Sequence, residues 1–252
     1  MIFNFHYRGM YKMNILGRKI STNTKRLAEE IVDMSSKKIN YYELTTKGKY
    51  GYVEHSSNCY NVYLSKQLDG EDFETNYLHE MRHIYQKEKG YPNVNSKSVF
   101  NEDEQNKVND IRDRLDSHIL DFDVNNWLLN NGYSIDCFLQ KSLETILNSE
   151  FPETSYYNHA FIQIQLYSIY PYLTELDKIK LKSHIEGTEY IEVFNKLIKV
   201  NALELISSNS CAIAMCEIID VLGLWNISKI KYRNNKIRTS NEYKTKKNEL
   251  IK

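Results

Sequence analysis

The sequence predicts an α+β protein that is mostly helical, with one small antiparallel sheet near its N-terminus. Residues 39–64 are rich in aromatic and other strand-favouring side chains and alternate with a period of two, which is typical of short strands. Before and after this region, apolar residues recur every three or four positions, as in amphipathic helices. The chain has 252 residues, of which 41% are hydrophobic, and can therefore bury a large core.

The N-terminal part is predicted to contain a helix, three strands and a second helix. The first helix has Thr22 or Thr24 as its N-cap and an apolar stripe from Leu27 to Met34. Three short strands joined by antiparallel hairpins follow, at residues 39–46, 50–55 and 59–64. The second helix covers residues 71–89 and ends at Gly90.

Beyond Pro92 the chain is expected to be helical almost throughout. The predicted helices cover residues 101–117, 119–131, 135–149, 155–170, 174–186, 188–200 and 202–224. We interpret residues 1–228 as a single domain, in which residues 20–90 hold the sheet and the helix after it, and residues 91–228 form the helical part. Residues 229–252 contain nine basic and two acidic residues, and we interpret them as a flexible basic tail.

The composition excludes several classes of function. The net charge is zero and no basic face is expected within the fold, so we do not expect nucleic acid as the main partner. The first 13 residues lack the apolar run of a signal peptide, and no segment is apolar enough for a transmembrane helix. The four cysteines have neither zinc-ribbon nor disulfide-framework spacing. We therefore expect a soluble, cytoplasmic protein with no membrane association.

Five residues inside the second predicted helix carry the chemistry: His79-Glu80-Met81-Arg82-His83, an HExxH motif. His79 and His83 are four positions apart, so on a helix both imidazoles point to the same side. Two neutral imidazole nitrogens are common zinc ligands. Glu80 lies beside them and can reach a zinc-bound water without binding the metal itself. The motif therefore predicts a zinc site with Glu80 as the general base for hydrolysis.

A catalytic zinc site needs a third protein ligand, and the sequence offers several. The metzincin extension of the motif is excluded, because it requires glycine at position 86 and histidine at position 89, where this chain has Gln86 and Lys89. The remaining candidates are Asp121, which we rank first, and then Glu104 and His118. His118 lies three positions before Asp121, so it can also orient Asp121 instead of binding the metal.

A second motif follows the first. The segment His118-Ile-Leu-Asp121-Phe-Asp-Val124-Asn-Asn-Trp-Leu128, ending in Asn131-Gly132-Tyr133, resembles the second helix of bacterial and phage-type HExxH zinc metallopeptidases, which are zincin-like and gluzincin-like. In that family this helix carries an aspartate shortly before a Val-x-x-x-Leu stretch and ends at a glycine and an aromatic residue. The resemblance covers residues 75–134. It implies a zincin-like fold and a Zn²⁺ ion held by His79, His83 and Asp121. For the predicted hydrolase we expect a peptide or protein substrate.

Two alternatives stay open on the sequence alone. The two histidines can lie on a polar helix face, paired with Glu80 or Glu74. The fold can also serve as a protein-interaction or regulatory module, with a structural or vestigial metal and no hydrolysis. If the protein is a hydrolase, an oxyanion-stabilising side chain is needed, and Tyr157 and His159 are the candidates in the C-terminal half.

Overall fold

The computed structural model describes residues 14–46, 49–98, 101–149, 156–200, 207–233 and 235–250. The fold is α+β and mostly helical, as predicted. Two compact units can be distinguished: the first holds the residues up to Lys89 and Trp127–Ile135, and the second holds Gly90–Asn126 and the residues from Asp136 onward. The single domain over residues 1–228 stays a prediction. No helix in the described ranges is long and apolar enough to cross a membrane.

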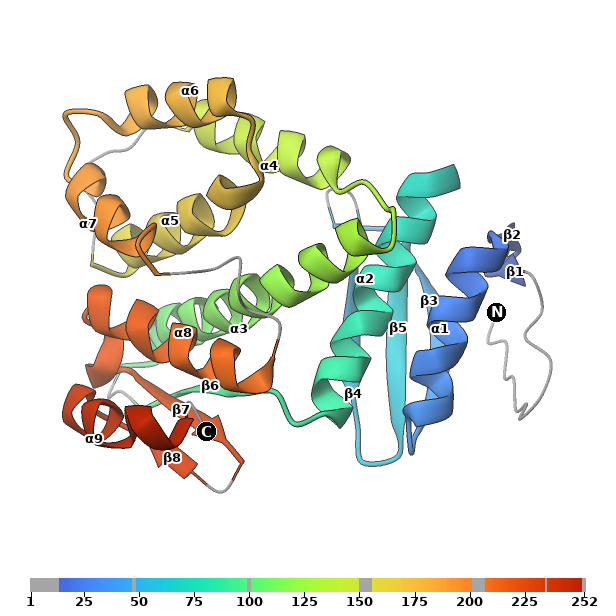
Figure 1. Ribbon diagram of the computed structural model, residues 1–252, viewed down its shortest axis with the longest axis horizontal. Coiled ribbons are helices and arrows are strands. Elements are labelled where there is room, and N and C mark those ends of the chain that lie inside the picture. Colours follow the sequence, from blue (N-terminus) through green and yellow to red (C-terminus); the bar gives the residue numbers. More distant parts are fainter. Residues whose placement is uncertain are drawn as a thin grey trace. The chain divides into compact units, whose positions relative to one another are not determined.

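In the first unit, two neighbouring helices lie over one face of a three-stranded sheet (Figure 1). A short antiparallel hairpin, β1 (Asn14–Ile15) and β2 (Arg18–Lys19), precedes them and was not predicted. The elements then follow in the order α1 (Thr22–Met34), β3 (Lys38–Leu44), β4 (Gly51–His55), β5 (Cys59–Ser65) and α2 (Gly70–Glu88). The strands β3, β4 and β5 and the helix α2 each begin within one residue of their predicted starts.

The sheet is mixed, which corrects the expectation of antiparallel hairpins throughout. Its strand order is β3-β5-β4, in which β4 pairs with β5 antiparallel, as predicted, whereas β3 pairs with β5 parallel. β5 takes the central place because it buries more of its length than the other strands, including Tyr60, Val62 and Leu64. The turn expected at residues 47–49 lies mostly outside the described residues.

The N-terminus of α1 is tied to α2. Its N-cap is Ser21 rather than either predicted threonine, because the Ser21 hydroxyl accepts from the Thr24 N–H. Glu74 of α2 reaches the same end: its carboxylate accepts from the Ser21 backbone N–H at 2.9 Å, from the Ser21 hydroxyl at 2.6 Å, and from the Thr24 hydroxyl. A carboxylate is favourable there because the start of a helix carries partial positive charge. These bonds fix α2, the helix of the HExxH motif, against α1.

α3 (Glu102–Asn130) is one continuous helix of 29 residues, where the sequence analysis predicted two. No glycine or proline interrupts it. Its buried face continues across the predicted break through Leu115, Ile119 and Phe122. The helix ends as predicted: Gly132 has a φ of +83°, and the Tyr133 N–H donates to the Leu128 carbonyl at 3.1 Å. Tyr133 is then buried in the first unit, with its hydroxyl 2.6 Å from that of Thr24.

The second unit is built mainly from helices. After α3 come α4 (Asp136–Leu147), α5 (Tyr156–Ile169), η1 (Tyr170–Tyr172), α6 (Glu175–Ile185), α7 (Tyr190–Leu197), α8 (Ser208–Val221), η2 (Leu224–Asn226) and α9 (Ser240–Leu250). Each α-helix from α4 to α8 lies inside a range that was predicted to be helical. Of those ranges, Ser155 and residues 202–206 lie outside the described part of the chain.

A second three-stranded sheet was not predicted. It joins, in antiparallel order, β6 (Asn93–Ser96), β7 (Ser228–Tyr232) and β8 (Asn235–Ile237). Residues 229–252, predicted to be a flexible basic tail, instead contribute most of β7, all of β8 and α9. Strand β7 was not recognised in the sequence because Lys229 and Lys231, which alternate with the buried Ile230 and Tyr232, made the segment look like a basic tail.

Candidate metal site

The two histidines of the HExxH motif converge from one side of α2. His79 and His83 lie one helical turn apart, and both side chains are half-buried. Their Nε2 atoms are 3.1 Å apart, and their rings make an angle of 77°. Two nitrogens bound to one tetrahedral zinc ion at about 2.0–2.1 Å lie roughly 3.3 Å from each other. The pair therefore has the spacing of two ligands of a single ion.

Glu80 is only 5% exposed, and its carboxylate lies beside the first residue of β4. A Cβ atom added to Gly51 would lie 2.8 Å from Glu80 Oε1 and 3.0 Å from its Cγ, so the glycine leaves the space that Glu80 fills. The start of the strand is also bound to α2 by Asn76, whose side-chain amide donates to the Tyr50 carbonyl at 3.0 Å. The sheet thus fixes the carboxylate on the helical turn that carries the histidines.

His83 has a defined neighbour at its other ring nitrogen. Its Nδ1 lies 2.9 Å from Oε1 of Gln86, a side chain that is 1% exposed. An amide oxygen can only accept a hydrogen bond, so in a neutral imidazole this contact requires the proton on Nδ1 and leaves a lone pair on Nε2. This neutral tautomer is the one that can bind a metal through Nε2.

Asp121 is the acidic candidate that the structure brings to the histidines. One ligand atom from each of His79, His83 and Asp121 lies within 4.8 Å of the others. Asp121 belongs to α3, whose last turn lies close to α2: the Arg82 guanidinium is 5.2 Å from the centre of the Trp127 ring. Among the residues that the structure describes, no second group of three His, Cys, Asp or Glu side chains converges in this way.

The two other candidates for a third ligand are not in this group. Glu104 is exposed in the first turn of α3, which is roughly 25 Å along the helix from Asp121. His118 lies beside Asp121, with its Nδ1 3.9 Å from Oδ2, and Arg114 donates to its Nε2 at 3.3 Å. Burial lowers the pKa of His118; Asp121 opposes this effect and Arg114 adds to it. The neutral His118 is thus placed to orient Asp121, which is one of its two predicted roles.

The neighbouring aspartates of α3 accept hydrogen bonds from the segment that contains Tyr91 and Val94. Asp116 accepts from the Val94 N–H of β6 at 2.5 Å. Asp123 is buried and accepts from the Tyr91 hydroxyl at 3.3 Å. Asp121, five positions after Asp116 and two before Asp123, lies on another side of the helix. The three acidic side chains therefore have distinct surroundings, although they look alike in the sequence.

Two charged residues close to the motif have partners of their own. Glu74, one of the residues that the histidines were expected to pair with if they bind no metal, receives the hydrogen bonds from Ser21 and Thr24 described above. Arg82, inside the motif, lies over two aromatic rings, with its guanidinium 3.9 Å from the centre of the Tyr85 ring in addition to its contact with Trp127. The alternative of a histidine–Glu74 pair therefore receives no support.

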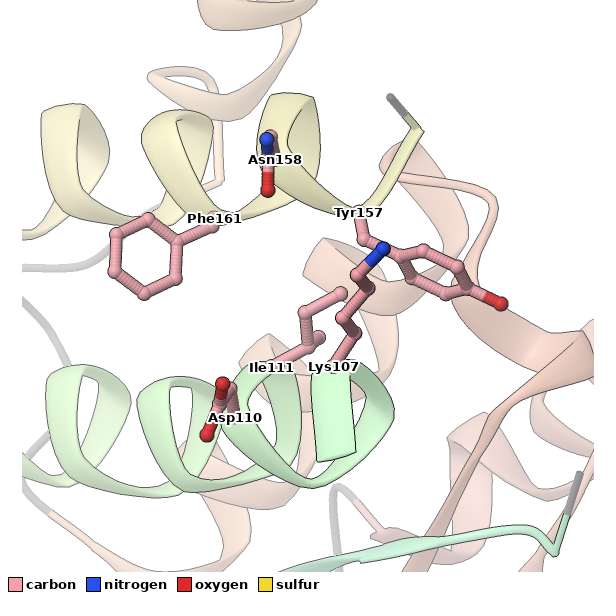
Figure 2. Close-up of a pocket in the computed structure, with 6 residues that line it drawn as sticks. All are labelled: Lys107, Asp110, Ile111, Tyr157, Asn158 and Phe161. Atoms are coloured by element: carbon pink, nitrogen blue, oxygen red, sulfur yellow. The ribbon is translucent and has the colours of Figure 1, made fainter. Parts of the chain in front are cut away.

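The predicted oxyanion side chains, Tyr157 and His159, have other surroundings. His159 stacks on Tyr190, with ring centres 4.6 Å apart. Tyr157 lines a pocket of about 140 Å³ between α3 and α5 (Figure 2), together with Lys107, Asp110, Ile111, Asn158 and Phe161. Ile111 is roughly 15 Å along α3 from Asp121. The structure therefore does not bring Tyr157 to the aspartate.

Tyr172, which the sequence analysis did not select, lies closer to Asp121. Its hydroxyl donates to the Phe122 carbonyl at 3.2 Å. Burial raises the pKa of Tyr172, and the negative charge of Asp121 raises it further. Tyr172 is thus a neutral phenol near the carboxylate at physiological pH, and only the fold could have shown this proximity.

Comparisons of the chain with models of protein families, with curated proteins and with solved structures give no significant match. The function of this chain is therefore inferred from its residues and their geometry. The arrangement offers three side chains of the types that bind zinc and one buried carboxylate next to them. Those are the protein groups that metal-assisted hydrolysis requires.

Proposed function

We propose that this protein is a zinc-dependent hydrolase of the zincin-like type and that it cleaves peptide bonds. The observation that carries the proposal is the approach of His79 Nε2 and His83 Nε2 to 3.1 Å, with the buried Glu80 on the same turn. Asp121 supports the proposal as a third ligand of a suitable type.

Each residue has a role in this scheme. His79, His83 and Asp121 would hold the ion and leave a fourth position open to water or substrate. When bound there, zinc acts as a Lewis acid and lowers the pKa of its water to about 7. Glu80 would take the proton from the attacking water and pass it to the leaving amine. Gly51 would keep the carboxylate in its position during both transfers.

A peptide is the substrate that the surroundings of Glu80 favour. Gly51, next to the carboxylate, is the first residue of β4, and β4 pairs with β5 and with no other described strand. An extended peptide can add to such a strand edge through main-chain hydrogen bonds. A peptide bound there would run close to Glu80.

The test compares the wild-type protein with Glu80→Gln. We expect the wild type to carry about one zinc ion per chain by elemental analysis, and to create new termini in a proteome-derived peptide library analysed by mass spectrometry. Glu80→Gln should retain the zinc and cleave about 10²- to 10⁴-fold more slowly, the range of general-base catalysis. Glu71→Gln is the matched control, because Glu71 is an exposed residue of the same helix.

The outcomes separate the parts of the proposal. A chain that takes up no zinc would refute the metal site. Cleavage that persists in Glu80→Gln would refute the role of Glu80. Zinc binding with no cleavage by the wild type would favour the alternative of an interaction or regulatory module over a hydrolase.

A further inference from the structure

Gln86 is a buried amide beside the second histidine of the HExxH motif. It follows His83 by three positions on α2, so both side chains lie on one side of the helix. Its side chain is 1% exposed, and its Oε1 lies 2.9 Å from His83 Nδ1. Burying an amide costs free energy unless it is hydrogen-bonded.

The contact decides which nitrogen of His83 carries the proton. A neutral imidazole that is free in water exchanges its proton between the two nitrogens, and only the form with a bare Nε2 can bind a metal through that atom. The Gln86 oxygen accepts a hydrogen bond from a protonated Nδ1. It therefore favours the form with a bare Nε2 and holds the ring at a fixed angle.

We infer that Gln86 is a positioning residue, which sets the tautomer and the ring orientation of His83 for metal binding. This inference rests on the proposed zinc site but concerns a residue that does not touch the ion. The amide does this without adding a negative charge beside the site, in contrast to the carboxylates that often orient metal-binding histidines.

Two substitutions separate hydrogen bonding from packing. Gln86→Leu keeps the size of the side chain and removes the acceptor, whereas Gln86→Glu keeps the acceptor. Gln163→Leu is the matched control: Gln163 is also fully buried, and it donates to the Tyr190 carbonyl at 2.8 Å on another helix, α5. The Kd for Zn²⁺ is measured by competition with a chromogenic chelator, and the tautomer of His83 is measured in the metal-free protein from its ¹⁵N NMR shifts.

We expect Gln86→Leu to weaken Zn²⁺ binding by about 10- to 100-fold, the usual effect of losing a hydrogen bond to a metal ligand. Gln86→Glu should bind at least as tightly as the wild type, and Gln163→Leu should leave the Kd unchanged. The metal-free wild type should carry the His83 proton on Nδ1.

Unchanged Zn²⁺ affinity in Gln86→Leu, or equal weakening in Gln86→Glu, overturns the inference. A proton on Nε2 in the metal-free wild type overturns it as well. If Gln86→Leu does not fold, Gln86→Glu and the wild-type tautomer still decide the question. A wild type that binds no Zn²⁺ overturns the proposed function, whereas the tautomer measurement remains a separate test of Gln86.

Discussion

Glu80 occupies space that exists only because residue 51 has no side chain. Gly51→Ala would place a Cβ atom 2.8 Å from Glu80 Oε1, so the carboxylate must move. Gly51 is not among the glycines with positive φ, so its φ angle allows alanine, although the added Cβ atom would also lie 3.0 Å from the Tyr63 carbonyl oxygen. Because a displacement of about 1 Å in a catalytic group can cost a factor of about 100, we expect peptide cleavage by Gly51→Ala to fall by about 10- to 100-fold.

Zinc content serves as the internal check on Gly51→Ala, since the histidines are not displaced directly. Glu54→Ala, at an exposed position of the same strand, should leave both cleavage and zinc content at their wild-type values. If Gly51→Ala cleaves as fast as the wild type, Glu80 does not need the position described above.

The residues of the site differ in how far the sequence could reveal them. The histidine pair and Glu80 were predictable because the spacing of a helix is local. Gly51 was not, because it meets Glu80 only through the packing of the sheet. Gln86 was visible three positions after the motif, but nothing in the sequence showed that it is buried. Asp121 was selected by resemblance, since no local pattern separates it from the other aspartates of α3.

At the scale of elements, the hydrogen bonds between Glu74 of α2 and the start of α1 fix the position of the motif helix in the first unit. Glu74 accepts two hydrogen bonds from Ser21 and one from Thr24 at the start of α1. Hydrogen bonds to a charged group contribute about 1.5–3 kcal/mol each, but the two bonds from Ser21 are exposed, so water can replace the carboxylate there. We expect Glu74→Ala to lower the free energy of unfolding by about 2–4 kcal/mol in urea titrations.

The comparison for this prediction is Glu30→Ala. Glu30 forms an exposed ion pair with Arg26 at 2.6 Å on α1, and such pairs contribute about 0–1 kcal/mol. Equal losses of stability in Glu74→Ala and Glu30→Ala would contradict the role given to Glu74.

The existence of most elements was predictable, whereas their pairing was not. Helices α4 to α8 and the strands β3 to β5 follow periods that can be seen within a short window. The parallel pairing of β3 with β5, and the sheet that joins β6 to β7, unite segments that are distant in the chain. The prediction of two helices in place of α3 was wrong, because the segment contains no glycine or proline that would interrupt a helix.

At the scale of the whole molecule, the proposed metal site links folding to zinc. Its ligands come from two helices, so the folded chain should bind the ion more tightly than the unfolded chain. At a free zinc concentration of about 100 times the Kd, the expected stabilisation is about 2.7 kcal/mol. For a chain of this size, that corresponds to a rise in Tm of about 5–10 °C, measured by circular dichroism with zinc and then with a chelator.

Two histidine variants test whether the effect arises at this site. His79→Ala should abolish the difference in Tm between zinc and chelator. His55→Ala should preserve it, because His55 is exposed at the end of β4 and is not part of the converging group. A Tm that does not respond to zinc in the wild type would contradict the prediction.

The α+β class was predictable at this scale because helical and strand periods are local. The inclusion of residues 127–135 in the first unit was not, because it depends on contacts between distant segments, such as that of Tyr133 with Thr24. The strands and the helix within residues 229–252 were not predicted, because the lysines of β7 alternate with its buried residues and the segment therefore looks uniformly basic.

The contact between Arg82 and Trp127 has a practical consequence. The chain contains two tryptophans, and one of them lies against a side chain inside the HExxH motif. The indole of Trp127 is therefore a built-in optical probe, whose fluorescence depends on the position of the motif helix. With Trp225 replaced by phenylalanine, the one remaining tryptophan would report ligand binding at α2 in real time, without any attached label.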